Sequence, residues 1–256
     1  GYFNMSSDEN NFQLTKDIAI SMLGNAALEV VPIEGGRNSS IYRIEHNDQV
    51  FAFKYFRTDK DGKRDRWEAE TTALELFAEY GITSTPKLIA KDREKNCILV
   101  EWIDGKRVQE YGAQEINDII GFIQEVHDIA PRVRGQKVRL ATDATLNGDE
   151  IVKQINSRLH RLEVSKDKYP ELGKFINEEF MPALKEITAW SQKGYQRSGL
   201  NFMKDISFEQ RTLSVVDFGF HNCLRKDDLY YFFDFEFFGW DDPVKLVADT
   251  LQHPGM

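Results

Sequence analysis

A chain of 256 residues with 41% hydrophobic and 29% charged residues can bury a substantial core and has the composition of a globular protein, which excludes a disordered or fibrous class. The formal net charge of -9, with no basic stripe, argues against a nucleic-acid partner. No apolar run is long enough to span a membrane. The two cysteines, Cys97 and Cys223, are too few for a disulfide framework, so we expect a cytoplasmic protein.

The first hundred residues predict an antiparallel sheet followed by one helix. Three short apolar runs are separated by turn residues, as in a meander, at residues 28–33, 40–45 and 49–56. Apolar residues then recur at helical spacing around Trp67, Leu74 and Phe77, and Gly81 stands where a C-cap glycine belongs. A second strand pair is expected at residues 87–90 and 97–102.

The chain becomes mainly helical after Gly105. One apolar helix face is formed by Ile116, Ile119, Ile120, Ile123 and Val126. Further helices are expected at residues 149–162 and 171–190, and strands at residues 213–216 and 230–235. We therefore predict a hinge near Gly105 that joins a sheet-containing lobe, residues 1–104, to a helical lobe, residues 105–256.

Three residues beside the last two strands indicate phosphoryl transfer. The strand at 213–216 leads to Asp217, Asn222 follows a short loop, and Asp234 comes at the end of an aromatic strand twelve residues later. Enzymes that transfer a phosphoryl group to a hydroxyl group need one carboxylate beside that hydroxyl group. They also need an amide oxygen and a second carboxylate to hold the metal that bridges the phosphates. A hairpin would bring Asn222 and Asp234 to the same end of paired strands. Order and strand context make the combination more specific than any one residue.

A lysine among aromatic residues, Lys54, indicates the nucleotide half of the same site. It could extend from a sheet edge into solvent, or lie over the α- and β-phosphates, oriented by a helical glutamate. Glu70 is the expected partner because it shares a helix face with Leu74 and Phe77. Three small residues, Gly35, Gly36 and Ser39, lie between the first two predicted strands, before the strand that carries Lys54. Their backbone N–H groups could approach phosphate oxygens there.

With these motifs in order, the chain resembles the aminoglycoside phosphotransferase and choline kinase family, relatives of the protein kinases. The resemblance extends from about residue 28 to the end. It rests on the loop at 34–39, Lys54, Glu70, the segment 98–105, Val126-His127, the loop from Asp217 to Asn222, Asp234, and the tail at 239–243.

The resemblance implies an α+β, bilobal protein-kinase-like fold and an enzyme that phosphorylates a hydroxyl group of a small molecule with ATP and Mg²⁺. Adenine would bind the backbone around Glu101 and Ile103. Asp217 would act as the base, and Asn222 and Asp234 would bind magnesium. Acceptors within this class include an amino sugar or another sugar, choline and an amino alcohol.

Two of the chain's departures from the family pattern concern the catalytic loop and the end of the chain. Val215-Val216 stand where the family usually has His-Gly before the catalytic aspartate, so a second hypothesis is a catalytically weak or silent nucleotide-binding module that regulates a partner. Only 22 residues follow Asp234, so we expect shortened closing helices.

Three further features have open interpretations. The aromatic residues between Tyr230 and Trp240 could form a buried strand or a cage for a cationic amine. His221, inside the loop after Asp217, could lie near phosphate or substrate, or be structural. The acidic residues Glu236, Asp241 and Asp242 mildly favour a cationic substrate or serve the fold.

Overall fold

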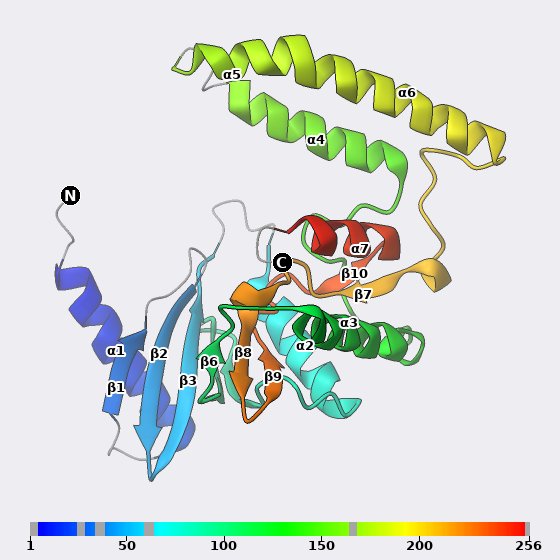
Figure 1. Ribbon diagram of the computed structural model, residues 1–256. Coiled ribbons are helices and arrows are strands. Elements are labelled where there is room, and N and C mark those ends of the chain that lie inside the picture. The colour runs from blue at the N-terminus through cyan, green and yellow to red at the C-terminus, as the bar shows by residue number, and fades with distance from the viewer. Residues whose placement is uncertain (1–4, 25–28, 34–38, 59–63, 164–167, 254–256) are drawn as a thin grey trace. The chain divides into compact units, whose positions relative to one another are not determined.

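The computed structural model (Figure 1) describes residues 5–24, 29–33, 39–58, 64–163 and 168–253. Gly35 and Gly36 lie outside the described residues. The chain divides into two compact units: the first comprises Gly1–Thr142, Thr212–Trp240 and Leu246–Met256, and the second comprises Asp143–Arg211 and Asp241–Lys245. The predicted boundary between two lobes at residue 104 does not coincide with the boundaries of these units, and it stays a prediction.

The first unit contains a five-stranded antiparallel sheet. Its strands are β1 (Glu29–Ile33), β2 (Ser39–His46), β3 (Gln49–Phe56), β4 (Leu88–Asp92) and β5 (Cys97–Glu101), and they lie in the order β1-β2-β3-β5-β4. The tight β2–β3 turn places Asn47 and Asp48 at φ 49° and 61°, a conformation that Asn and Asp tolerate better than most residues. The predicted meander and second strand pair are confirmed, and β3 is the central strand.

A helix that the sequence interpretation did not anticipate, α1 (Met5–Leu23), packs on this sheet (Figure 1). Ile18 and Ala19 are buried in one cluster with Val30, Ile44 and Phe53 of the first three strands. Burial of these side chains gives the outer half of the sheet its own hydrophobic core.

Helix α2 (Arg66–Glu79) contains the residues predicted at helical spacing, and it ends just before Gly81 as expected. The Asp65 side chain accepts a hydrogen bond from the Glu68 N–H at 3.0 Å, which caps the first turn. Gly81 follows the helix with φ 79°, and the Ile82 N–H donates to the Phe77 carbonyl at 2.8 Å. Glu70 is buried together with Leu74 and Phe77 of the same helix, so packing of this face turns Glu70 inward.

The rest of the first unit surrounds an aromatic core. It contains β6 (Lys106–Arg107), α3 (Ala113–Val133), β7 (Thr212–Ser214), a 3₁₀ turn (Phe220–Asn222), β8 (Cys223–Lys226) and β9 (Leu229–Phe232). Phe122 of α3 stacks on Phe232 with ring centroids 4.4 Å apart, and Phe77 meets Phe235 edge-on at 5.1 Å. Phe238 and Trp240 are also buried, so the buried members of the aromatic run, Phe232, Phe235, Phe238 and Trp240, are core packing.

Two predicted strands are shorter than expected. The strand at 213–216 ends at Ser214, because Val216 and Asp217 adopt φ values of 53° and 20° that do not continue an extended chain. The strand at 230–235 ends at Phe232, two residues before Asp234, whose φ is 70°. Left-handed backbone therefore occurs at both aspartates singled out from the sequence.

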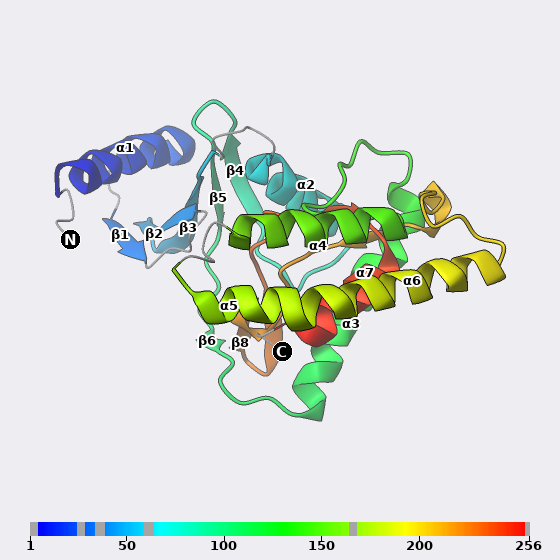
Figure 2. The same ribbon diagram turned by 90° about the horizontal axis from the view of Figure 1, so that it is seen from above.

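The second unit is helical, with α4 (Gly148–Glu163), α5 (Pro170–Phe175), a π-helical turn (Ile176–Phe180), α6 (Met181–Arg197) and a 3₁₀ turn (Phe208–Gln210). The single helix predicted at 171–190 is thus interrupted, and it extends further. Pro182 cannot donate a helical hydrogen bond, and the Met181 N–H reaches the Ile176 carbonyl, five residues back. Figures 1 and 2 show α6 running alongside α4.

The chain closes with β10 (Gly239–Asp241), which pairs with β7, and α7 (Pro243–Gln252). One closing helix therefore follows Asp234 within the described residues. Across those residues, none of the helices combines the length and apolar character needed to cross a membrane.

A close backbone contact at Gly239 gives a stability prediction. An added Cβ would lie 2.4 Å from the Ala141 nitrogen and 2.5 Å from the Arg139 oxygen, both backbone atoms that bond to Trp240. We expect Gly239→Ala to lower the free energy of unfolding by about 3 kcal/mol, at the upper end of overpacking effects, because backbone cannot move aside as a side chain can. The measurement is urea denaturation monitored by circular dichroism.

The matched control is Gly121→Ala on the exposed side of α3, where an added Cβ has no neighbour within 4 Å. This change should raise the unfolding free energy by about 0.5–1 kcal/mol, since alanine favours a helix interior over glycine. Equal midpoints for the two variants would contradict the packing argument.

Candidate functional site

The site is built around Lys54 on the central strand β3. Its Nζ donates to Glu70 Oε2 on α2 at 2.6 Å and to Asp234 Oδ1 at 2.7 Å. The Lys54 and Glu70 side chains are each 7% exposed, so this is a buried ion pair. The alternative of a lysine reaching solvent from a sheet edge is therefore wrong. Glu68, two residues before Glu70, points elsewhere and pairs with Arg139 at 3.1 Å.

The charges in this cluster shift one another's pKa values. Burial alone would lower the pKa of Lys54, but the negative charges of Glu70, Asp234 and Glu236 outweigh it and hold that pKa above its ordinary value. Burial raises the pKa of Glu70 to about 7; Asp234 and Glu236 push it in the same direction, and Lys54 opposes them. The lysine is therefore a fixed cation among three carboxyl groups, and a further cation would be attracted to them.

The loop from Asp217 to Asn222 is held by its own hydrogen bonds. Asn222 Nδ2 donates to the Asp217 carbonyl at 3.0 Å, and the Asn222 N–H donates to the Gly219 carbonyl at 3.1 Å. The Phe233 N–H donates to the Asn222 carbonyl at 3.2 Å, directly beyond the β8–β9 pair. Asn222 and the residue before Asp234 thus face each other, which is the strand-end arrangement expected from the sequence.

The carboxylate of Asp217 faces two histidines. Its Oδ1 lies 2.8 Å from His253 Nε2 and 3.5 Å from His221 Nε2, and the two imidazole rings stack with centroids 4.7 Å apart. The sequence had singled out His221. It gave no sign of His253, which lies 36 residues after Asp217 and meets it only through the fold of the closing helix.

The remaining predicted residues lie on the sheet and at its end. Ser39 is buried at the start of β2, opposite Phe56 of β3. Glu101 ends β5, where its N–H donates to the Lys87 carbonyl at 2.9 Å, and the Ile103 carbonyl accepts from the Gly105 N–H at 3.0 Å. The predicted phosphate contacts of Gly35 and Gly36 concern residues outside the described ranges.

Two of the acidic residues near the tail serve the fold of the second unit. Asp241 is fully buried, accepts from the Thr145 N–H at 3.1 Å and pairs with Lys245 at 3.2 Å. Asp242 Oδ1 accepts from the Val244 N–H at 2.8 Å at the start of α7. The structural interpretation of Asp241 and Asp242 is thus supported.

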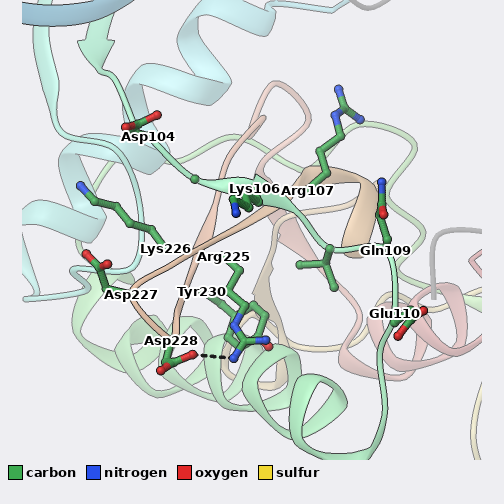
Figure 3. Close-up of a pocket in the computed structure, with 12 residues that line it drawn as sticks. Asp104, Lys106, Arg107, Gln109, Glu110, Arg225, Lys226, Asp227, Asp228 and Tyr230 are labelled. Carbon is green, nitrogen blue, oxygen red and sulfur yellow. Dashed lines mark hydrogen bonds and ion pairs between the residues drawn. The ribbon is translucent and has the colours of Figure 1, made fainter.

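A pocket of about 650 Å³ lies beside Gly105, lined by residues 104–110 and by side chains of the β8–β9 hairpin (Figure 3). Basic and acidic side chains line it in similar numbers, and Arg225 pairs with Asp228 at 2.5 Å within it. Its lining includes neither Lys54 nor Asp217. The pocket is therefore separate from the charged cluster, and its balanced charge favours no one class of ligand.

Comparison with solved structures defines the fold class. A thermostable mutant of aminoglycoside phosphotransferase APH(4)-Ia, bound to ADP and hygromycin B, has 13% identity and a TM-score of 0.57, covering 91% of this chain and 75% of its own. Choline kinase from Cryptosporidium parvum Iowa II has 14% identity and a TM-score of 0.58, with coverage of 91% and 67%. Choline kinase LicA from Streptococcus pneumoniae has 16% identity and a TM-score of 0.54, with coverage of 94% and 73%. The fold is that of the protein-kinase-like phosphotransferases.

The family follows from the sequence itself. Residues 29–253 match the phosphotransferase enzyme family, and the chain therefore belongs to that family. Its class is that of the small-molecule kinases, which confirms the resemblance inferred from the motifs. No curated protein sequence matches the chain at a significant level.

Proposed function

We propose that this protein transfers the γ-phosphate of ATP, with Mg²⁺, to a hydroxyl group of a small molecule. One observation carries the proposal: Lys54 is held between Glu70 and Asp234, with bonds of 2.6 and 2.7 Å. Phosphoryl transfer relies on positioning and electrostatic stabilisation, and a buried, fixed ammonium group supplies both.

The nucleotide would occupy the sheet side of the cluster. Lys54, oriented by Glu70, contacts the α- and β-phosphates in this proposal. The backbone N–H groups of Gly35, Gly36 and Ser39 approach the phosphate oxygens. Adenine bonds to the backbone of Glu101 and Ile103, where the sheet leads into the predicted hinge at Gly105.

The donor set at the end of the β8–β9 pair fits magnesium. The side-chain nitrogen Nδ2 of Asn222 is used within the loop, so the side-chain oxygen Oδ1 is the atom that would bind the metal. Asp234 supplies a carboxylate that is 32% exposed. Oxygen donors of this kind are those that Mg²⁺ prefers. When bound, the ion neutralises phosphate charge; Asn222 and Asp234 hold it, and Lys54 keeps Asp234 in place.

Asp217 is the proposed base. Its side chain is exposed, and the loop hydrogen bond from Asn222 fixes its backbone. The carboxylate accepts the proton of the acceptor hydroxyl as that oxygen forms a bond to the γ-phosphorus, and the bond from phosphorus to the ADP oxygen breaks. The products are a phosphate monoester and ADP.

The acceptor is proposed as a hydroxylated small molecule such as a sugar, an aminoglycoside-like compound, choline or an amino alcohol. The structures with the same fold include a phosphotransferase bound to hygromycin B and two choline kinases. The net charge of -9 favours the cationic members of this set. Asp241 and Asp242 no longer strengthen that preference, because they serve the fold.

A catalytically silent nucleotide-binding module is the second candidate. Two observations favour it: Val216, a β-branched residue, is held at φ 53°, and His253 bonds to the carboxylate of Asp217. In that case nucleotide would bind at Lys54 without turnover.

The test is ADP release from MgATP in the presence of a panel of hydroxylated amines, sugars and amino alcohols. ADP formation that depends on one acceptor, with a phosphate monoester identified by mass spectrometry, supports the kinase. Thermal stabilisation by MgATP without turnover on any acceptor supports the silent module. Absence of both nucleotide binding and turnover contradicts the two candidates together.

A further inference from the structure

Two histidines, His221 and His253, face Asp217 and have no role in the proposed kinase reaction. One ligand atom from each residue lies within 4.8 Å of the others. Both imidazoles turn Nε2 toward the same oxygen, Asp217 Oδ1, at 2.8 and 3.5 Å. The side chains of Asp217, His221 and His253 are 44%, 36% and 25% exposed, so an ion from solvent can reach them.

The spacing is close to that of a tetrahedral metal site. With metal–ligand distances of about 2.1 Å, ligand atoms in a tetrahedron lie roughly 3.4 Å apart. The two oxygen–nitrogen distances bracket this value, and all three ligand atoms lie within 4.8 Å of one another, which is close to the spacing that a bound ion needs. Three protein ligands leave a fourth position for water, as in open zinc sites.

The backbone around the cluster restricts how far these groups can move. His221 lies in the 3₁₀ turn between Phe220 and Asn222, both buried, and the Phe220 ring stacks on Tyr111 with centroids 4.2 Å apart. His253 is placed by α7, where its N–H donates to the Thr250 carbonyl at 3.4 Å. One histidine therefore lies in a 3₁₀ turn and the other directly follows α7 (Pro243–Gln252), which lowers the entropy cost of binding.

We propose that Asp217, His221 and His253 bind a late first-row divalent metal ion, with Zn²⁺ as the probe that defines the site. Two imidazole nitrogens and one carboxylate suit zinc and its neighbours, whereas magnesium prefers oxygen donors. The site is thus separate in chemistry from Asn222 and Asp234, although it uses the same loop. It also places a cation on the proposed base, so zinc inhibits phosphoryl transfer if Asp217 acts as proposed.

The decisive experiment measures zinc binding to the full chain without substrate, in millimolar MgCl₂, by competition with a chromophoric chelator. We expect one ion per chain. His221→Ala and His253→Ala should each weaken binding by more than tenfold, since even outer-shell partners of metal ligands contribute about 10- to 100-fold. Co²⁺ in place of zinc should give the visible absorption of a four-coordinate ion in the parent protein and lose it in both variants.

Three controls keep the outcome decisive. His160→Ala removes an exposed histidine on α4, and Asp234→Asn alters the proposed magnesium site; both should leave the zinc affinity unchanged. His253→Gln keeps a hydrogen-bond donor for Asp217 but is a poor zinc ligand, so it should behave as His253→Ala does. Equal affinities for the parent and all histidine variants, or loss of binding only in Asp234→Asn, would overturn the proposal. Neither result depends on whether the kinase reaction occurs.

Discussion

Replacing Asp217 with asparagine is expected to lower kcat for acceptor phosphorylation by roughly 10²- to 10⁴-fold, the usual contribution of a positioned general base. The asparagine side chain has the same shape but cannot accept the hydroxyl proton in the same way. Asparagine also tolerates the φ of 20° found at this position, so the loop should keep its conformation. Stabilisation by MgATP in a thermal melt should be unchanged, since the proposed nucleotide contacts are made by other residues.

Asp228→Asn is the matched control for this substitution. Asp228 also has left-handed backbone, with φ 62°, and its side chain is 88% exposed in the β8–β9 turn, where it pairs with Arg225. The same chemical change at that position should leave kcat within about twofold, because an exposed ion pair contributes little. If Asp217→Asn keeps the parent kcat on an identified acceptor, Asp217 is not the base.

Much of the proposed nucleotide half of the site could be predicted because it depends on local periodicity. Alternation in β3 and the helix phase of α2 are properties of short segments, and each determines which way a side chain points. The two phases together place Lys54 against Glu70, at 2.6 Å in the structure, and turn Glu68 away. The strand-end position of Asn222 and Asp234 follows in the same way from a hairpin.

The missing parts depend on contacts between distant segments. His253 reaches Asp217 only because α7 returns to the first unit, and no local pattern marks that contact. Helix α1 has a polar first half, so its apolar side is visible only near Ile18 and Ala19. The two strands end where Val216 and Asp234 adopt positive φ values, and this backbone conformation cannot be predicted from side-chain hydrophobicity.

Lys54→Met is expected to have the largest combined effect on stability and activity. Methionine keeps the length of the side chain but removes the ammonium group, leaving Glu70, Asp234 and Glu236 without the cation between them. Breaking one partner of a buried ion pair typically costs about 3–5 kcal/mol, because the remaining charge is left in a poorly solvated site. The loss of one preorganised phosphate contact should lower kcat/KM by about 10²- to 10³-fold.

The stability loss should depend on pH in a defined direction. The folded pKa of Glu70 is raised to about 7 from an ordinary value of 4.5, so folding holds a proton that the unfolded chain releases between these values. Such a group favours folding at low pH, and its contribution is lost as the pH rises through its folded pKa. Without Lys54 that pKa rises further, because the lysine opposes the shift. The deficit of Lys54→Met should therefore be larger at pH 8 than at pH 6.

Urea denaturation of the parent, Lys54→Met and Lys91→Met at pH 6 and pH 8 separates this explanation from a simple change of surface charge. Lys91 on β4 pairs with Glu75 of α2, and both side chains are largely solvated, at 41% and 51% exposed. Its loss should cost no more than about 1 kcal/mol at either pH. A Lys54→Met deficit equal to that of Lys91→Met, or one that grows as the pH falls, would mean that the ammonium group is not what keeps Glu70 and Asp234 together. The geometry proposed for the bound nucleotide would then lose its support.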